Sequence, residues 1–374
     1  MPWKHLIVRT LLSWSALAIC LGCEALVVHK VGFAAVAGMT RQERLDELFS
    51  DFAREAPGLA VGVARNGEVL FQKGYGLADL ERKTPIAPDT AFHIASCGKE
   101  MTAVAVLMLV EEGKLDLDKS VAKYLPEMRG WGRKVTLREL LHHTAGIPDT
   151  YEALKGRGGV PTGTDALRLL ARWHRLDYSP GTQFLYSDSG YDILGTLIHR
   201  VSRQSYPAFL EERIFRPAGM KDTFVYDPER LKTAKRALGY DRGFGGWWIL
   251  DDDSPLNLLY GSGGVYSTVA DLARYDRALF GGQLLRPASL ASMFQPAELQ
   301  DGTTVPYGFG WSLKTDDHGE PYYGHSGNWL GFTAYYLHFP KDGLAVMILS
   351  NRSDTDTEYL ATTAAEMFRE GGSR

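Results

Sequence analysis

Residues 92–103 read FHIASCGKEMTA and place two nucleophile candidates, Ser96 and Cys97, shortly before a lysine, Lys99. The residues that follow are strongly helix-forming, so this stretch predicts a helix over 99–113 with residues 96–99 in its first turn. Residues three apart share one face of a helix, whereas residues two apart do not. Ser96 is therefore expected to contact Lys99, and Cys97 is expected to face away as a small buried side chain.

Serine is a weak nucleophile until a neighbouring group takes its proton. Lysine can take that proton if desolvation or nearby cations make its neutral form accessible. The same spacing occurs again at Ser120 and Lys123, which we interpret as a helix cap followed by an exposed lysine. A serine three residues before a lysine is therefore weak evidence for catalysis by itself.

Patterns typical of strands lie at both ends of the chain. Residues 58–65 and 67–76 alternate in polarity around Asn66-Gly67, a strong hairpin signal. Three more strands are expected in YYGHSG, GFTAYYLHF and GLAVMILSN, with a closing helix at 355–369. The expected helices are an N-terminal one at 40–56 and a central set at 99–113, 136–142, 164–175, 190–202, 206–214 and 268–280.

This order of elements predicts an α+β fold. We expect a central antiparallel sheet formed from both chain ends and flanked by helices, with an inserted mainly helical lobe. The sheet lobe would span about 39–95 and 300–374, and the helical lobe about 100–299. Two glycine-rich stretches, 156–163 and 239–248, are expected to be surface loops.

The composition indicates a globular domain without a nucleic-acid partner, because the net charge is -4 and no basic field is present. Residues 1–38 resemble a signal peptide, with basic residues before an apolar run. We therefore expect export to the periplasm or the exterior, with any membrane association made through this leader. Two alternatives stay open: an uncleaved anchor, and translation from Met39, which would leave the protein in the cytoplasm. Two of the three cysteines lie in the leader, so the remaining chain cannot form an internal disulfide.

Two further motifs follow in order along the chain. PGTQFLYSDSGYDILG at 180–195 carries Tyr186 and Asp188, and YGHSGNWLGF at 323–332 carries His325, Ser326 and Gly327 at the start of an expected strand. With Ser96 and Lys99, these motifs make the chain resemble the family of class C β-lactamases, serine DD-peptidases and β-lactamase-related esterases. The resemblance covers nearly all of 40–370 and includes VTLRELLHHTAGIPD and GSGGVYSTVADLARYDRAL.

The resemblance implies a role for each motif residue. Ser96 would be the acylated nucleophile, and Lys99 would accept or relay its proton. Tyr186 would act with Lys99 as the base and then protonate the leaving group. Backbone N–H groups of Ser96 and Asn328 would form the oxyanion hole. The strand that begins at His325 would flank the substrate, so Asp188, His325, Ser326, Gly327 and Asn328 are the implied substrate-binding residues.

Two residues depart from the pattern of the family. The second motif usually ends in asparagine, and here the residue is Asp188, which can accept but not donate a hydrogen bond when ionised. Asp188 should instead pair with Lys99 and favour its charged form, which makes Lys99 a poorer base. The third motif has His325 where β-lactamases usually have lysine, and a neutral imidazole attracts a substrate carboxylate less. We therefore expect an esterase or D-aminoacyl peptidase with weak or no β-lactamase activity.

The substrate would be a small-molecule ester, a D-amino-acid peptide or a β-lactam. No cofactor or metal is expected, because His142 and His143 diverge on a helix and no other ligand motif supports them. Trp247 and Trp248 would line the mouth of the cleft or anchor a long loop. An α/β-hydrolase is excluded because the chain has no G-x-S-x-G elbow. A non-catalytic penicillin-binding or sensor protein with the same fold is the remaining alternative.

Overall fold

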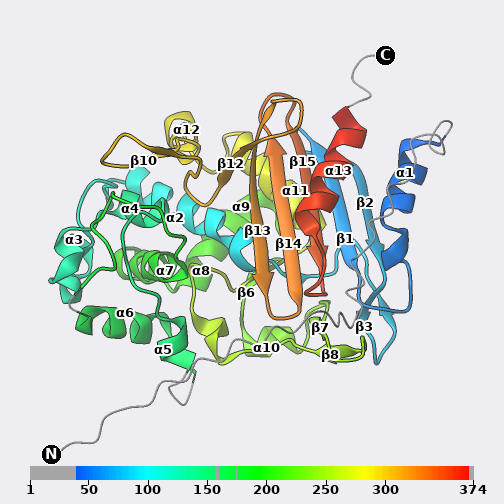
Figure 1. Ribbon diagram of the computed structural model, residues 1–374, viewed down its shortest axis with the longest axis horizontal. Coiled ribbons are helices and arrows are strands. Elements are labelled where there is room, and N and C mark those ends of the chain that lie inside the picture. The colour runs from blue at the N-terminus through cyan, green and yellow to red at the C-terminus, as the bar shows by residue number, and fades with distance from the viewer. Residues whose placement is uncertain (1–38, 156–159, 174, 370–374) are drawn as a thin grey trace, which may run out of the picture. The chain divides into compact units, whose positions relative to one another are not determined.

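The computed structural model describes residues 39–155, 160–173 and 175–369, and the predicted leader lies outside them. Its main feature is an antiparallel sheet in the order β12-β13-β14-β15-β1-β2. These strands are β1 (Leu59–Arg65), β2 (Glu68–Tyr75), β12 (Ser312–Thr315), β13 (Pro321–Trp329), β14 (Phe332–Phe339) and β15 (Leu344–Ser350). The two ends of the chain meet where β1 pairs with β15 (Figure 1). The predicted α+β fold, with its sheet built from both chain ends, is confirmed.

The tight turn between β1 and β2 is the one that the sequence predicts. Asn66 and Gly67 have φ angles of 50° and 80°, the left-handed region that a two-residue hairpin of this type requires. The three strands predicted near the C-terminus are present as β13, β14 and β15, and they form consecutive antiparallel pairs.

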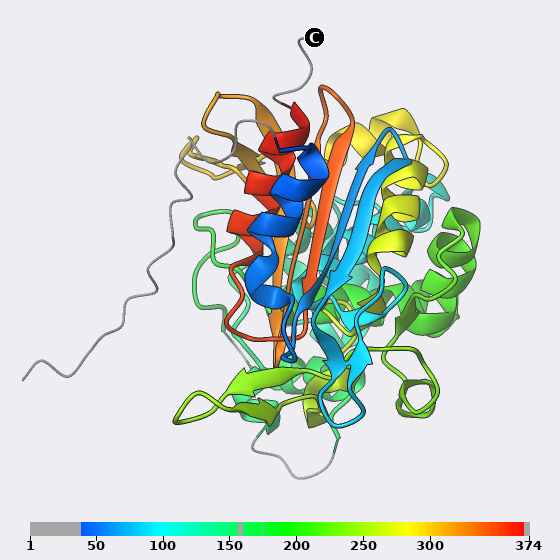
Figure 2. The same cartoon turned by 90° about the vertical axis from the view of Figure 1, so that its right-hand side faces the viewer.

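Both faces of this sheet are covered. Helices α1 (Arg41–Leu48) and α13 (Thr357–Arg369) lie side by side over one face, as Figure 2 shows. Helix α11 (Val269–Phe280) packs against β1 and β15 on the other face. Strand β15 serves both layers, because Leu344, Val346 and Ile348 enter one core and the residues between them enter the other. Gly62 on β1 lets α11 approach, since a Cβ there would lie 2.9 Å from Val269 Cβ.

The remaining helices gather beside the sheet (Figure 1). They are α2 (Lys99–Glu111), α3 (Val121–Tyr124), α4 (Leu137–Leu141), α5 (Tyr151–Lys155), α6 (Gly163–Arg172), α7 (Asp188–Ser202), α8 (Tyr206–Leu210), α9 (Arg216–Ala218), α10 (Pro228–Leu231) and α12 (Pro287–Met293). Helix α7 contacts α2, α4, α6 and α8, which makes it the centre of this group. No helix in the described ranges is long and apolar enough to cross a bilayer.

Short strands complete the fold. They are β3 (Leu77–Asp79), β4 (Thr84–Pro85), β5 (Phe92–His93), β6 (Phe224–Val225), β7 (Tyr240–Arg242), β8 (Trp248–Leu250), β9 (Val265–Ser267), β10 (Ala297–Glu298) and β11 (Thr304–Val305). Strands β5, β9 and β6 form a small sheet, and β5 ends just before the turn that carries Ser96.

Three sequence-based predictions of element type or extent are wrong. The N-terminal helix predicted to reach residue 56 ends at Leu48 and gives way to a 3-10 turn over Ser50–Phe52. The helix predicted over 206–214 is divided into α8 and a π-helical segment, Glu211–Phe215. The stretch 239–248, predicted as a loop, instead starts the β7–β8 hairpin. Of the other predicted loop, residues 156–159 lie outside the described residues, and the limits of the two lobes stay a prediction.

Candidate active site

Ser96 lies on a short 3-10 turn, Ala95–Gly98, that leads directly into α2. The turn is strained, because Ala95 has a φ of 48°, a conformation that costs an L-residue ~1–2 kcal/mol. The Ala95 N–H donates to His93 Nδ1 at 3.1 Å, which helps to hold this conformation. Such strain is typical of functional sites whose surroundings fix the backbone.

Lys99 is completely buried and makes three contacts through its ammonium group. Its Nζ donates to Ser96 Oγ at 2.9 Å, to Asp188 Oδ1 at 2.6 Å and to the backbone carbonyl of Ser262 at 2.7 Å. The predicted contact between Ser96 and Lys99 is therefore confirmed, as is the predicted pairing of Asp188 with Lys99. Ser262 lies just before β9 and was not identified from the sequence, although it belongs to the GSGGVYS stretch that carries part of the resemblance.

Tyr186 completes the group of residues around Ser96. Its hydroxyl lies within hydrogen-bonding reach of Lys99 and Ser96, and its ring centroid is 4.9 Å from Lys99 Nζ. The residue ends the loop before α7, and the next residue, Ser187, caps that helix by accepting the Gly190 N–H. The cap fixes where α7 begins, and Asp188 is therefore the first residue of the helix.

The charges in this group favour protonated Lys99 and protonated Tyr186 at neutral pH. Burial lowers the pKa of Lys99, but the interactions with Tyr186 and Asp188 outweigh burial and raise it above its usual value. Burial also raises the pKa of Tyr186; Lys99 and a hydrogen bond from Ser96 oppose that rise, whereas Asp188 adds to it. The residue is 39% exposed overall, but its hydroxyl lies against the buried ammonium group.

Strand β13 passes directly beside the Ser96 turn. Gly327 allows this approach, because a Cβ there would lie 2.3 Å from the carbonyl oxygen of Ile94. The Cys97 thiol donates to the His325 carbonyl at 3.1 Å, and the thiol is 1% exposed. The predicted burial of Cys97 is confirmed. Its pKa is raised by burial, so the thiolate is disfavoured.

The third motif lies within β13, not at its start as predicted, because the strand begins at Pro321. Ser326 and Asn328 are exposed, whereas His325 is 4% exposed and turned inward. Asn328 lines the pocket beside Ser96, but His325, Ser326 and Gly327 do not. His325 is therefore not part of the pocket wall; its side chain contacts the Tyr307 hydroxyl and the Ser326 carbonyl.

A chain of hydrogen bonds with a fixed direction joins two histidines near Tyr186. The Ser187 N–H donates to His143 Nδ1 at 3.0 Å, and His325 Nδ1 lies 2.6 Å from the Ser326 carbonyl, which can only accept. His143 Nε2–H therefore donates to the Tyr307 hydroxyl at 3.1 Å, and that hydroxyl donates to His325 Nε2 at 2.9 Å.

Both histidines in this series of hydrogen bonds are neutral. Burial lowers the pKa of His143 well below its usual value and lowers the pKa of His325 to about 4. The His143 ring packs against the Tyr186 ring, with centroids 4.3 Å apart. From the sequence, His142 and His143 were interpreted as packing residues and not as a metal pair. His143 does pack in the interior, and one ring that it contacts is that of the candidate catalytic residue Tyr186. Tyr307 lies in the stretch PYGFGW, which gave no sequence signal for this role.

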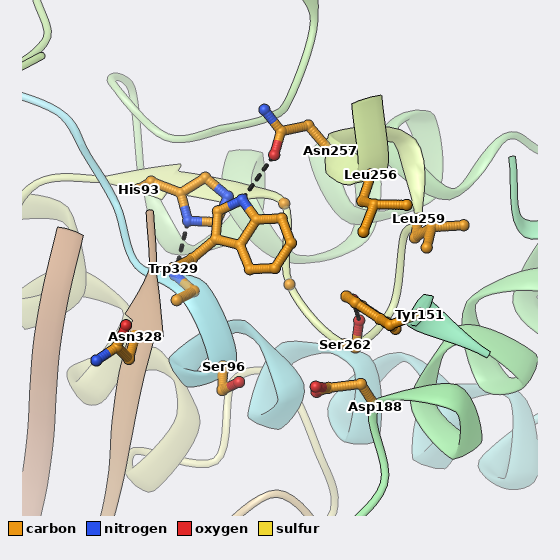
Figure 3. Close-up of a pocket in the computed structure, with 13 residues that line it drawn as sticks. His93, Ser96, Tyr151, Asp188, Leu256, Asn257, Leu259, Ser262, Asn328 and Trp329 are labelled. Carbon is orange, nitrogen blue, oxygen red and sulfur yellow. Dashed lines mark hydrogen bonds between the residues drawn. The ribbon is translucent and has the colours of Figure 1, made fainter. Parts of the chain in front are cut away.

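The pocket beside Ser96 is lined largely by residues that the sequence did not single out (Figure 3). They are His93, Ala95, Tyr151, Leu256, Asn257, Leu259, Ser262, Gly263, Gly264 and Trp329, together with Ser96, Asp188 and Asn328. Trp329 Nε1 donates to Asn257 Oδ1 at 2.7 Å, which fixes the indole across the pocket from Asp188. Several of them nevertheless lie in stretches that the sequence analysis quoted: His93 and Ala95 beside Ser96, Ser262 to Gly264 in GSGGVYS, and Trp329 directly after the third motif.

Three other predicted features lie outside this pocket. Ser120 holds the N-cap position of α3, although its side chain makes no capping hydrogen bond, and Lys123 is exposed as predicted. Trp248 is packed between the guanidinium groups of Arg242 and Arg352, so it anchors the β7–β8 hairpin. Trp247 is 60% exposed and does not line the pocket.

Comparisons with known proteins agree with this geometry. The model of the Beta-lactamase family matches residues 45–367. Penicillin-binding protein 4* of Bacillus subtilis strain 168 is 32% identical over 310 residues, which make up 79% of this chain and 68% of that protein.

Solved structures give the same picture. The octameric penicillin-binding protein homologue from Pyrococcus abyssi has a TM-score of 0.77 and 28% identity, covering 88% of this chain and 77% of that one. The D-amino acid amidase from Ochrobactrum anthropi SV3, solved with L-phenylalanine amide, has a TM-score of 0.74 and 26% identity, covering 89% and 99%.

Proposed function

The chain belongs to the Beta-lactamase family of serine hydrolases, and on that premise we propose that it cleaves an ester or amide bond through an acyl-enzyme on Ser96. The observation that carries this proposal is the position of the buried Lys99 ammonium, 2.9 Å from Ser96 Oγ and within reach of the Tyr186 hydroxyl. This arrangement brings together the nucleophile Ser96, the base Tyr186 and Lys99, whose charge adjusts the pKa of that base.

In the proposed acylation step, ionised Tyr186 removes the hydroxyl proton of Ser96 while Ser96 Oγ bonds to the substrate carbonyl carbon. Lys99 stays protonated and its positive charge stabilises the phenolate, because Nζ lies 4.9 Å from the centre of the Tyr186 ring. The ion pair with Asp188 supports this assignment, since it holds Lys99 in its charged form. Tyr186 is therefore proposed as the principal base.

The tetrahedral intermediate carries negative charge on the former carbonyl oxygen. We assign the backbone N–H groups of Ser96 and Asn328 as its donors, since both residues line the same pocket. Tyr186 then gives its proton to the departing alcohol or amine as the C–O or C–N bond breaks. Water attacks the acyl-enzyme, Tyr186 takes its proton, and the carboxylic acid leaves as that proton returns to Ser96 Oγ.

We propose an esterase or D-aminoacyl peptidase-like activity with weak or no β-lactamase activity. Support comes from Asp188, which replaces the amide donor usual in the family, and from neutral His325, which offers no cation to a substrate carboxylate. The similarity to a D-amino acid amidase supports amide substrates of this kind.

The test combines labelling with turnover. The protein is treated with a fluorophosphonate and digested, and the adduct is expected on the peptide that contains Ser96. A chromogenic short-chain ester is expected to turn over, with a Ser96→Ala variant as the matched control. An adduct on Cys97 or Ser120, or equal ester turnover by Ser96→Ala, would contradict the assignment.

A second candidate is a non-catalytic penicillin-binding or sensor protein. The observation that favours it is the Lys99–Asp188 ion pair, because charged Lys99 is not itself a base. A fluorescent penicillin that labels Ser96 stably, with no turnover of any ester, would support the sensor.

We also propose that residues 1–38 direct export, on the sequence pattern given above. Mass spectrometry of the mature protein would show its N-terminus. The residues AVA at 35–37 fit a small-x-small cleavage site. A protein that begins at Met1 or Met39 would contradict cleavage there.

A further inference from the structure

The pocket beside Ser96 has an uneven charge. Among the residues that line it, all within the described part of the chain, Asp188 is the one with an acidic side chain. Asp188 is 33% exposed, and its carboxylate points toward Ser96 in Figure 3. Lys99, the partner of Asp188, is completely buried and does not line the pocket. A substrate therefore meets the carboxylate before it meets the ammonium.

No lysine or arginine is among the described residues that line the pocket. His325 is neutral, and both of its nitrogens are occupied, Nδ1 by the Ser326 carbonyl and Nε2 by the Tyr307 hydroxyl. His93 also lines the pocket, and burial lowers its pKa to about 3, so it is neutral as well. A substrate carboxylate would enter next to Asp188 without a cationic side chain from the pocket wall to offset the repulsion.

From this charge pattern we propose that the site selects acyl donors that carry a free ammonium group beside the scissile carbonyl and no carboxylate, namely aminoacyl esters and aminoacyl amides. Asp188 would accept a hydrogen bond from that ammonium through the oxygen that Lys99 does not occupy. This proposal rests on hydrolysis at Ser96.

The spacing fits such a substrate. Ser96 Oγ and Asp188 Oδ1 both contact Lys99 Nζ, at 2.9 and 2.6 Å, so the carboxylate lies close to the point of attack. The nitrogen of an α-ammonium group is two bonds from the carbonyl carbon, which brings it to the same neighbourhood.

Part of the pocket wall is apolar. Leu256, Leu259 and the rings of Tyr151 and Trp329 line it, and the two rings meet edge to face with centroids 5.9 Å apart. Such a wall suits an apolar or aromatic amino-acid side chain. Phenylalanine esters are therefore suitable probes.

The experiment compares three methyl esters of phenylalanine, in both configurations: the free amine, the N-acetyl derivative and the N-succinyl derivative. The first can carry a positive charge beside the ester carbonyl, the second is neutral, and the third carries a negative charge at the far end of its succinyl group. At pH 7 we expect kcat/KM to be about tenfold higher for the free amine than for the N-acetyl ester, the scale of one partly screened charge contact. The N-succinyl ester is expected to be the poorest substrate.

Asp188→Asn should bring the ratio between the free-amine and N-acetyl esters close to one. The ratio cancels any general loss of activity, which a purely structural role of Asp188 would produce. Asp118→Asn, which removes the same charge from an exposed ion pair with Arg138, is the matched control and should leave the ratio unchanged.

If Asp188→Asn turns over no ester, the wild-type pH dependence decides. The preference for the free amine should disappear as its α-amino group, with a pKa of about 7.7–8.0, loses its proton. A wild-type ratio near one, or a ratio that Asp188→Asn or rising pH leaves unchanged, would overturn this inference alone. Absence of both ester turnover and Ser96 labelling would instead overturn the proposed function.

Discussion

Replacement of Asp188 by asparagine should shift the pH dependence of the reaction. In the wild type, both candidate bases, Tyr186 and Lys99, have a raised pKa, and Asp188 contributes to each. Their deprotonated forms are therefore scarce at pH 7 and increase as pH rises, so kcat/KM should increase with pH. Asp188→Asn removes the negative charge. The pKa of each base then falls, and the rising limb of the profile moves to lower pH.

The size of the shift follows from the geometry of the ion pair. Lys99 Nζ and Asp188 Oδ1 are 2.6 Å apart, and Asp188 is one-third exposed. At that separation two unit charges interact by ~1.6 kcal/mol with the dielectric constant of water, and more strongly where water is excluded. The asparagine carbonyl would keep one hydrogen bond to Lys99, which recovers part of this energy. We therefore expect a shift of about one pH unit, which corresponds to ~1.4 kcal/mol.

The assay is the kcat/KM of a neutral ester between pH 6 and 10 for the wild type, Asp188→Asn and Asp118→Asn. A neutral ester is used so that titration of the substrate does not enter the profile. Circular dichroism and thermal midpoints would establish that the variants are folded across this range. A limb that stays in place, or moves to higher pH, would refute the assignment of Tyr186 or Lys99 as the base.

Three further predictions concern residues around this group. Cys97→Ala should retain most ester turnover, because the thiol is buried and bonded to a backbone carbonyl; a hundredfold loss, about the effect of removing an acid–base group, would show that it takes part. Tyr307→Phe should lower kcat about tenfold, the scale of one buried hydrogen bond, and should alter the pH profile, because the two histidines that it joins lose a shared partner. Tyr206→Phe, another buried hydroxyl, is its control, and an equal loss in both variants would reduce Tyr307 to a packing role. Asp192→Asn should reduce the loss of thermal stability that the wild type shows as pH rises from 4 to 8. Burial raises the folded-state pKa of Asp192 to about 8, so only the unfolded chain ionises it in that window. An unchanged slope of thermal stability against pH in the variant would contradict this.

The sequence predicted the parts of the site that depend on short spacings. A serine three residues before a lysine at the start of a helix must present both to one side, and the structure shows the contact. The strand patterns at the two chain ends likewise predicted the sheet, and its central strands β1, β14 and β15 are buried along their length because helices cover both faces. The pairing of Asp188 with Lys99 was predicted from the family resemblance, because the second motif supplies a carboxylate in place of the usual amide.

The boundaries of elements were harder to predict. The N-terminal helix ends at Leu48 although helical spacing continues to residue 56, since its burial depends on packing against α13 rather than on its own pattern. The β7–β8 hairpin was missed because its glycines are also typical of loops. Arg242 and Arg352 pack on Trp248 and help to fix the hairpin, which is a tertiary contact that the local sequence does not reveal.

By itself, the sequence determined the fold class and the contact between Ser96 and Lys99, because these follow from the order of elements and from local spacing. The pairing of Asp188 with Lys99 was predicted from the family resemblance. Only the tertiary structure decided which residues surround them. Tyr307 and His143 are 164 residues apart, and they meet because the segment before β12 packs against the turn after α4. The pocket wall likewise combines Tyr151, Leu256 and Trp329 from separate segments. Contacts of such long range leave no periodic signal in the chain, since they arise from packing whole elements together and not from the conformation of any one segment.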